Sequence, residues 1–239
     1  MNSAPPEIET FKKIIERYAP SGPAIGRFKE TEFAVIAGPA VSGKDTLRNG
    51  LLNEYPDKYH RVMSLTTRKA RPDEDLAYEY VSFDEMKARA DDKKLLQVAL
   101  VHNQQVSAID NAEVDSLISS EKTGLSILIV QEERKLYGLN PRIRTVFLIP
   151  PSFDDMMQRL NDERALQTAE IRRRLQAAKK EIEIALATKR YYCLVSDVRS
   201  DVRFRADEFF RTGEKNLDFD KDAREICGRI LKELNSKKL

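Results

Sequence analysis

The 239-residue chain contains no tryptophan, only two cysteines and only two histidines. Cys193 and Cys227 are too few for a disulfide framework, and by themselves they do not complete a zinc site. Two histidines likewise argue against an imidazole-rich metal centre. The first residues, 1–7, have neither the basic region nor the apolar region of a secretory signal. These absences predict a reduced, cytoplasmic protein.

Long apolar runs and an excess of charge of one sign are also missing. The densest apolar stretches, Leu125–Val130 and Val146–Ile149, are far too short to span a bilayer, and the mean hydropathy is −0.53. The 41 basic and 39 acidic residues leave a net charge of +2, so there is no bulk electrostatic attraction to nucleic acid or membrane. An apolar content of 41% still permits a core, and the length suits one domain, or one with sizeable additions.

Short apolar runs alternate along the chain with helical patterns. Strands are predicted at Phe33–Ala37, Arg61–Leu65, Tyr78–Ser82, Leu95–Val101, Leu125–Val130, Thr145–Ile149 and Tyr192–Ser196. Helices are predicted at Glu7–Tyr18, Leu47–Tyr55, Asp84–Ala90, Glu113–Ser120, Phe153–Leu160, Ile171–Ala185 and Asp222–Leu234. Residues 199–219 are charged and show no clear periodicity. The alternation predicts an α/β fold with a mostly parallel sheet, in which Leu125–Val130 is the best candidate for a central strand.

The segment from Gly38 to Lys44 fits the phosphate-loop pattern G-x-x-x-x-G-K, and it lies between a predicted strand and a predicted helix. Glycines let the backbone turn its N–H groups toward one phosphate, the helix N-terminus adds a positive dipole end, and Lys44 supplies a mobile charge. Asp45 stands where the pattern usually has a Ser or Thr that binds Mg²⁺, and a carboxylate is also a hard oxygen ligand. The predicted ATP-binding residues are Gly38, Ala40, Val41, Ser42, Gly43, Lys44, Asp45 and Thr46.

A basic loop, Ser64–Glu74, follows the phosphate loop after one predicted helix and one predicted strand. Arg68 and Arg71 lie close together in this loop and could fork onto a second phosphate group. A solvated basic loop accounts for the same two arginines equally well. The residues alone leave both interpretations open.

Four motifs in sequence order resemble the guanylate kinase family. The phosphate loop resembles that family's G-P-x-x-x-G-K, and Ser64–Glu74 resembles its acceptor-phosphate motif S-x-T-T-R-x-x-R-P-x-E. Further on, Ile149–Met156 with Arg159 resembles the P-P-S segment that leads into its lid, and Arg174–Ala178 resembles the arginine after the lid. The resemblance covers about residues 32–198 and the terminal helix.

The resemblance implies a P-loop kinase fold in which a parallel sheet is flanked by helices. Residues 1–31 would then be a helical extension, and residues 32–239 the guanylate-kinase-like domain. Within that domain we expect an acceptor-binding subdomain at about 61–108, a lid at about 153–175 and a charged insertion at about 199–219.

The resemblance also implies roles for individual residues. Lys44, Arg159 and Arg174 would act catalytically by neutralising the transferring phosphoryl group, and Arg164 would join them only if one residue is inserted. A solvated helix face with ion pairs is the alternative for these arginines. Asp45 would hold Mg²⁺, with Glu132 acting through water. The implied acceptor-binding residues are Ser64, Arg68, Arg71, Glu74, Tyr78, Gln97 and Ser107.

The base-reading positions depart from the family. Its guanine-reading glutamate falls on Gln97, and an amide can accept hydrogen bonds with only one of its two ends. The family's G-N-x-Y-G-S stretch is replaced by residues 102–107, and the asparagine near the adenine becomes Ser196. The D-x-D after the central strand keeps only one carboxylate, that of Glu132. We therefore expect the phosphate chemistry to be kept and the base recognition to differ.

The resemblance implies an ATP-dependent, Mg²⁺-using kinase of the nucleoside-monophosphate class, a monomer or homodimer with a small phosphorylated acceptor and no nucleic-acid or membrane partner. Three alternatives stay open. One is GMP kinase proper despite Gln97, and a second is a ribose-bisphosphate-type sugar-phosphate kinase, which resembles this chain in having Asp after the phosphate-loop Lys. The third is a non-catalytic guanylate-kinase-like module that binds proteins, and it ranks last because such modules typically lose the phosphate loop.

Overall fold

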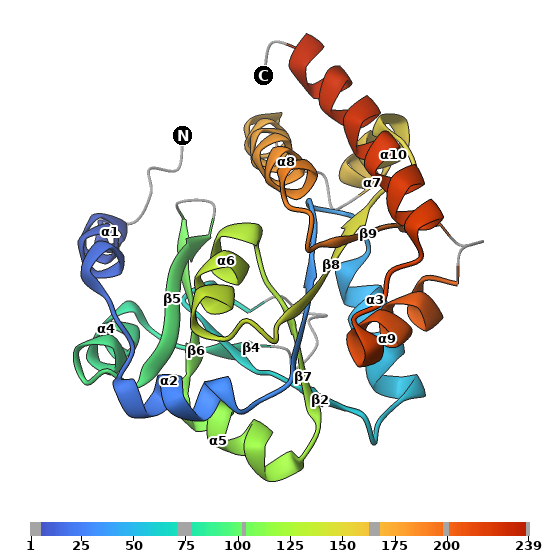
Figure 1. Ribbon diagram of the computed structural model, residues 1–239. Coiled ribbons are helices and arrows are strands. Elements are labelled where there is room, and N and C mark those ends of the chain that lie inside the picture. Colours follow the sequence, from blue (N-terminus) through green and yellow to red (C-terminus); the bar gives the residue numbers. More distant parts are fainter. Residues whose placement is uncertain (1–5, 71–77, 102–103, 163–167, 198–200, 238–239) are drawn as a thin grey trace. The chain divides into compact units, whose positions relative to one another are not determined.

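The computed structural model describes residues 6–70, 78–101, 104–162, 168–197 and 201–237 (Figure 1). The helices are α1 (Glu7–Arg17), α2 (Gly22–Lys29), α3 (Lys44–Glu54), α4 (Phe83–Asp91), α5 (Asn111–Ser120), α6 (Val130–Leu139), α7 (Phe153–Asp162), α8 (Thr168–Ala187), α9 (Val202–Thr212) and α10 (Leu217–Ser236). The strands are β1 (Phe33–Ala37), β2 (Tyr59–Arg61), β3 (Ser64–Thr66), β4 (Tyr78–Tyr80), β5 (Leu95–Val101), β6 (Gln105–Asp110), β7 (Thr123–Ile127), β8 (Arg144–Ile149) and β9 (Tyr192–Val195). None of the described helices has the length and apolar character needed to cross a membrane.

The chain divides into two compact units, each assembled from separate stretches of sequence. The first comprises Met1–Phe33, Asp57–Ser126 and Gln131–Ile143. The second comprises Ala34–Pro56, Ile127–Val130 and Arg144–Leu239. Residues far apart in the sequence therefore share one core within each unit.

A five-stranded sheet has the strand order β2-β7-β1-β8-β9. β1 pairs with β8, β2 with β7 and β8 with β9, and all three ladders are parallel. Every residue of β1 is buried, which explains why Phe33–Ala37 carries no polar side chain. The predicted α/β fold, a parallel sheet flanked by helices, is confirmed.

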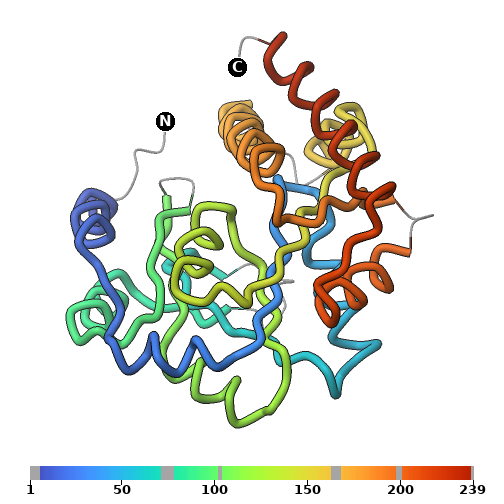
Figure 2. Tube along the Cα trace, viewed as in Figure 1, coloured from blue at the N-terminus to red at the C-terminus, as the bar shows by residue number. Residues whose placement is uncertain are grey.

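In the second unit α9 and α10 pack against β8 and β9. Figure 2 shows α10 running beside α8, and α10 also contacts β9. Cys193 on β9 and Cys227 on α10 are both fully buried free thiols in this core. The apolar face predicted for the terminal helix is thus used for packing, although the helix begins five residues earlier, at Leu217 rather than Asp222.

A four-stranded sheet in the first unit has the order β4-β3-β6-β5. One of its faces is covered by α1 and α4, which lie beside β5 in Figure 1. The residues of this core share complete or nearly complete burial: Phe11, Leu65, Val81, Met86, Ala90, Leu95, Val98, Val106 and Ala108. The predicted N-terminal helix is therefore part of this unit's core.

A β-bulge interrupts the pairing of β5 with β6. Leu95 pairs with Asp110 and Gln97 pairs with Ile109, so two steps on β5 match one step on β6. Without a bulge, residues two apart point to the same face of a strand. Here Leu95 packs in the apolar core, whereas Gln97, next to core residue Val98, faces the other side of the sheet.

Two strand predictions are wrong in their bounds. Leu125–Val130 was expected to be one strand, but β7 ends at Ile127 and Val130 begins α6, because a short apolar run suits a buried strand and a buried helix start equally. Arg61–Leu65 was also expected to be one strand. It is split between β2 and β3, which belong to different sheets, since the chain crosses from one sheet to the other at this point.

Four helices or strands were not predicted. α2 follows the proline-containing break, with the Ser21 hydroxyl capping its N-terminus, and β6 and α6 carry too few regularly spaced apolar residues to stand out. Residues 199–219 show no clear periodicity in the sequence, yet Val202–Thr212 within them forms α9. Its buried residues Ala206, Phe209 and Phe210 cover only one turn among charged neighbours, so the helical period is hard to see.

Candidate active site

The phosphate loop between β1 and α3 has a backbone that depends on its two glycines. Gly38 has a φ of 146° and Gly43 a φ of 85°. A Cβ atom at position 38 would lie 2.2 Å from the carbonyl oxygen of Leu148, so a side chain does not fit there. Gly43 is the N-cap of the 11-residue α3, whose free N–H groups and dipole favour an anion at this end.

Two polar groups of the loop are arranged for a phosphate. Lys44 Nζ donates to the carbonyl oxygens of Gly38 at 2.9 Å and Pro39 at 2.6 Å. Ser42 is fully buried, and its hydroxyl has no hydrogen-bond partner among the described residues. A buried hydroxyl and an ammonium group resting on loop carbonyls are groups that phosphate oxygens would satisfy. The loop therefore fits a nucleotide phosphate.

A pocket of about 1000 Å³ opens on this loop. Its lining residues all belong to the second unit: Val41, Gly43, Lys44, Asp45, Thr46, Leu47, Leu148, Arg159, Ser196, Asp197, Asp201, Val202 and Arg203. Of the other predicted ATP-binding residues, Gly38 and Ser42 are buried in the loop and Ala40 is half-buried. The last five lining residues come from the end of β9 and the start of α9, and Asp197, Asp201 and Arg203 were not predicted as site residues. No motif marks them.

Arg159 of α7 reaches the phosphate loop. Its Nη1 donates to the carbonyl oxygen of Val41 at 3.2 Å and to the Ser196 hydroxyl at 2.9 Å. Its Nη2 donates to the Ser196 carbonyl oxygen at 3.1 Å. Three hydrogen bonds fix the guanidinium at the wall of the pocket, where it would face the charge of bound phosphates.

The carboxylate of Asp45 lies in the first turn of α3 and lines the pocket. Arg48 Nη2 is 3.1 Å from its Oδ1, and the Arg48 side chain is 5% exposed, whereas that of Asp45 is 72% exposed. Mg²⁺ in phosphate-transfer sites usually takes one or two carboxylates together with substrate phosphate oxygens. One exposed carboxylate beside a phosphate loop fits that pattern.

The second predicted magnesium ligand lies elsewhere. Glu132 is buried in α6 and belongs to the first unit, so its action together with Asp45 stays a prediction. Within the described ranges no three His, Cys, Asp or Glu side chains gather as a possible metal site.

Arg174 of α8 is paired with a carboxylate of its own helix. Its Nε lies 3.1 Å from Glu170 Oε1, and Arg173 Nη2 lies 2.7 Å from Glu170 Oε2. Burial alone would raise the pKa of Glu170, but the hydrogen bond and charge of Arg174, together with Arg173, outweigh it and lower this pKa. Glu170 thus holds Arg174 as an ion pair. Arg164 lies outside the described residues.

Four of the predicted acceptor-binding residues lie on one face of the four-stranded sheet: Ser64, Tyr78, Gln97 and Ser107. Ser64 pairs with Tyr78 across β3 and β4, and Ser107 pairs with Thr66 and Ala99. Because the alternating residues Leu65, Val98 and Ala108 face the apolar core, Ser64, Gln97 and Ser107 face the opposite side. Arg71 and Glu74 lie outside the described residues.

Gln97 is the least satisfied polar side chain of this face. Its side chain belongs to a residue that is 4% exposed, and neither its Oε1 nor its Nε2 has a hydrogen-bond partner among the described residues. Burying an unpaired amide costs on the order of 1–3 kcal/mol. A ligand that offers one donor and one acceptor side by side would remove that cost.

Arg68 is held at the edge of the same sheet by two aromatic rings. Its guanidinium carbon lies 5.1 Å from the ring centre of Tyr78 and 5.6 Å from that of Tyr80. Its backbone N–H donates to the Thr66 hydroxyl at 3.3 Å. The two rings hold the guanidinium group in position, where an acceptor phosphate would bind it.

Comparison with known proteins shows to which family the chain belongs. The family model for guanylate kinase matches residues 30–197. The chain belongs to the guanylate kinase family. It is similar to the guanylate kinase of Chlamydia caviae, with 30% identity over 164 residues, 68% of this chain and 78% of that one. It is also 30% identical to the guanylate kinase of Corynebacterium jeikeium over 166 residues, 68% of this chain and 87% of that one.

A solved structure shows the same fold. The crystal structure of guanylate kinase from Anaplasma phagocytophilum matches with a TM-score of 0.56 and 19% identity, covering 88% of this chain and 96% of that chain. Membership of the family makes the protein an ATP-dependent phosphotransferase of the nucleoside-monophosphate kinase class. The family match ends before α9, so this helix is not accounted for by the family model.

Proposed function

We propose that the protein transfers the γ-phosphoryl group of Mg-ATP to the phosphate of a nucleoside monophosphate, and that GMP is not its preferred acceptor. The observation that carries the donor half is the phosphate loop. Three features lie together at the N-terminus of α3: the glycine-dependent backbone, the ammonium group of Lys44, and the buried Ser42 hydroxyl, which has no hydrogen-bond partner in the described part of the chain. A non-catalytic binding module would have no need of this arrangement.

On the donor side, Lys44 would exchange the carbonyl oxygens of Gly38 and Pro39 for β- and γ-phosphate oxygens. Arg159 is already hydrogen-bonded to the loop through Val41, and Arg174 would exchange its ion pair with Glu170 for one with a phosphate oxygen. These cations stabilise charge that spreads over the transferring group in the transition state. Mg²⁺, when bound, neutralises the β- and γ-oxygens further, and Asp45 would help to hold it.

On the acceptor side, Arg68 would bind the monophosphate, with the hydroxyl groups of Ser64 and Tyr78 as further donors. Predicted Arg71 and Glu74 would complete this part of the site. None of these groups distinguishes one base from another. The choice of acceptor therefore depends on the base-side residues, Gln97 above all.

Gln97 offers one donor and one acceptor to a base. The adjacent amine and ring nitrogen of adenine or cytosine would satisfy both. Guanine can pair with the amide through O6 and N1–H, but the single amide oxygen then leaves the N2–H₂ group of guanine without an acceptor on Gln97. An unpaired buried donor costs enough to shift acceptor preference by one or two orders of magnitude. The alternative, GMP kinase proper, is favoured by the names of the relatives.

The test is steady-state kcat/KM with ATP as donor and GMP, AMP, CMP, UMP and ribose phosphates as acceptors. We expect at least one other acceptor to exceed GMP, and Gln97→Glu to shift the ratio toward GMP. Gln176→Glu adds the same charge at an exposed position of α8 and serves as the control. If the wild-type kcat/KM with GMP is well above that with every other acceptor, the protein is an ordinary guanylate kinase and the proposed acceptor preference is wrong. Lys44→Ala should abolish turnover with all of them.

A further inference from the structure

The helix α9, which the family model leaves unmatched, is anchored by buried aromatic side chains on one face and by hydrogen bonds at its C-terminal end. Phe209 and Phe210 are buried, and the ring of Phe209 lies 5.2 Å from that of Tyr192 on β9. At the C-terminal end, Arg144 Nη1 donates to carbonyl oxygens of the last turn. A helix anchored in this way presents its first turn as a preformed surface.

That first turn lines the nucleotide pocket. Asp201, Val202 and Arg203 share the pocket with Lys44 and the rest of the phosphate loop. At about 1000 Å³, the pocket is at the upper end of the range for small-molecule sites and larger than a triphosphate group needs. The walls away from the loop are therefore available to the remainder of a nucleotide.

Arg203 packs on the surface of α3, where Gly50 leaves space for its side chain and Glu54 forms an ion pair with it. A Cβ atom at Gly50 would lie 2.5 Å from Arg203 Cδ, so the aliphatic part of Arg203 occupies the space that glycine leaves. Arg203 Nη1 lies 3.4 Å from Glu54 Oε2, one helical turn further along. Packing and charge thus hold a guanidinium that is itself 57% exposed.

The walls contributed by the β9 end and by α9 suit a planar base. A guanidinium group stacks on aromatic rings, and Val202 adds an apolar contact. The carboxylates of Asp197 and Asp201 are acceptors, which matches an exocyclic amine such as that of adenine. We propose that Arg203 stacks on the base of the donor nucleotide, with Gly50 and Glu54 as its positioning residues. This inference rests on the proposed function and names a base subsite within it.

The experiment compares two ligands by calorimetry in the presence of Mg²⁺: ATP, and inorganic tripolyphosphate, which has phosphates but no base. Arg203→Ala should weaken ATP binding about tenfold and leave tripolyphosphate binding unchanged. Arg203→Lys keeps the charge without the planar group, so it should weaken ATP binding nearly as much. Arg211→Ala, on the same helix and exposed, is the matched control.

Gly50→Ala tests the space on α3 that the Arg203 side chain occupies, without changing Arg203 itself. Alanine favours a helix over glycine, so the variant should melt no lower than wild type. Its Cβ nevertheless displaces the Arg203 side chain, and ATP binding should weaken while tripolyphosphate binding does not. Gly228→Ala in α10, where an added Cβ has no neighbour within 4 Å, is the control.

The outcomes separate this inference from the proposed function. Equal weakening of ATP and tripolyphosphate by Arg203→Ala would show that Arg203 serves the phosphates, and the inference would be overturned. No weakening of either, with wild type binding both, would overturn it while the proposed function stands. Failure of the wild-type protein to bind either ligand would overturn both.

Discussion

The hydroxyl of Tyr18 donates a hydrogen bond to the carbonyl oxygen of Leu95 and accepts one from the Leu95 N–H group at 3.2 Å. Leu95 begins β5 at the bulge, two residues before Gln97. Tyr18 thus bonds both backbone polar groups of Leu95, next to the irregular part of the ladder. The N-terminal segment thereby stabilises the strand on which the predicted base-reading residue lies.

Tyr18→Phe should lower the free energy of unfolding by about 1–2 kcal/mol, because two backbone groups lose their partner while the ring stays. Burial raises the pKa of Tyr18, so the hydroxyl keeps its proton and the effect should be present throughout the neutral range. We also expect the KM for the acceptor to rise and that for ATP to stay constant. Urea unfolding and steady-state kinetics measure the two effects. A variant as stable as wild type would contradict the role given to Tyr18.

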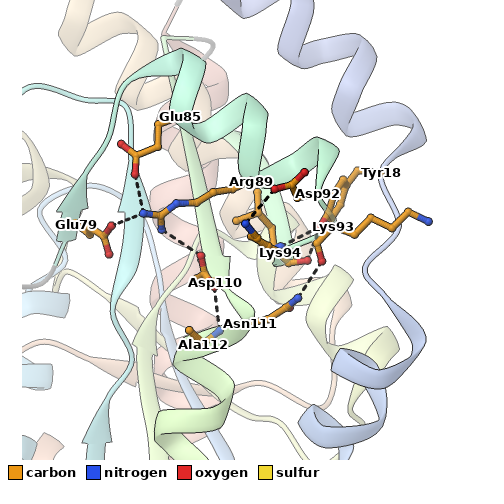
Figure 3. Close-up of polar contacts among 11 residues, drawn as sticks. Tyr18, Glu79, Glu85, Arg89, Asp92, Lys93, Lys94, Asp110, Asn111 and Ala112 are labelled. Carbon is orange, nitrogen blue, oxygen red and sulfur yellow. Dashed lines mark hydrogen bonds and ion pairs between the residues drawn. The ribbon is translucent and has the colours of Figure 1, made fainter.

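Arg89 of α4 joins three carboxylates from different parts of the first unit (Figure 3). It pairs with Glu79 of β4 and Glu85 of its own helix at 2.7 Å, and with Asp110 of β6 at 3.1 Å. Arg89→Ala should therefore destabilise the protein by about 1–3 kcal/mol, since the carboxylates are left close together without a cation.

The control for Arg89 is Lys87 on the same helix. Its ion pair with Asp91 is exposed, with 47% and 57% of the two side chains accessible. Lys87→Ala should cost less than about 0.5 kcal/mol. Similar losses of unfolding free energy for the two variants, measured with urea, would show that the Arg89 ion pairs contribute no more to stability than an exposed pair.

Local patterns predicted the strand and the turn of the phosphate loop well. The apolar run Phe33–Ala37 and the glycine spacing after it are short-range signals, and they fix both β1 and the turn that presents Lys44. The acceptor half depended on long-range facts. Tyr18 and Leu95 are 77 positions apart, and regular alternation would have put Leu95 and Gln97 on the same face of the strand. No local pattern encodes a bulge that a distant hydroxyl stabilises.

The ion pair of Glu170 should make stability depend on acid. The pKa of Glu170 is lower in the folded protein than its unfolded value of about 4.3, so its stabilising effect is complete above that value. It is lost as the pH falls through the folded pKa. The stability difference between wild type and Glu170→Gln should therefore be largest near neutrality and shrink as the pH falls below about 5.

Urea unfolding at several pH values measures this difference. Glu183→Gln changes an exposed carboxylate of the same helix and is the control. Arg174 would exchange Glu170 for a phosphate oxygen during the reaction, so the Gln variant should retain phosphotransfer, whereas Arg174→Ala should lower kcat by at least about a hundredfold. A stability difference that grows on acidification would have the wrong sign for a carboxylate with a lowered pKa.

Asp45 provides a test of how this phosphate loop manages Mg²⁺. Its carboxylate is exposed in the pocket and paired with the buried Arg48. Asp45→Ser supplies a hydroxyl oxygen ligand, so it should keep part of the activity and need several-fold more Mg²⁺ for half-maximal rate. Asp45→Lys places a second cation beside Arg48 and where the metal must bind, and it should lose activity at every Mg²⁺ concentration. Asp45→Asn separates charge from shape, and its Mg²⁺ requirement should resemble that of the Ser variant. Thermal melting checks that all three variants fold. Equal rates for the Ser and Lys variants at limiting Mg²⁺ would mean that position 45 takes no part in holding the ion, and that substrate oxygens hold it without this carboxylate.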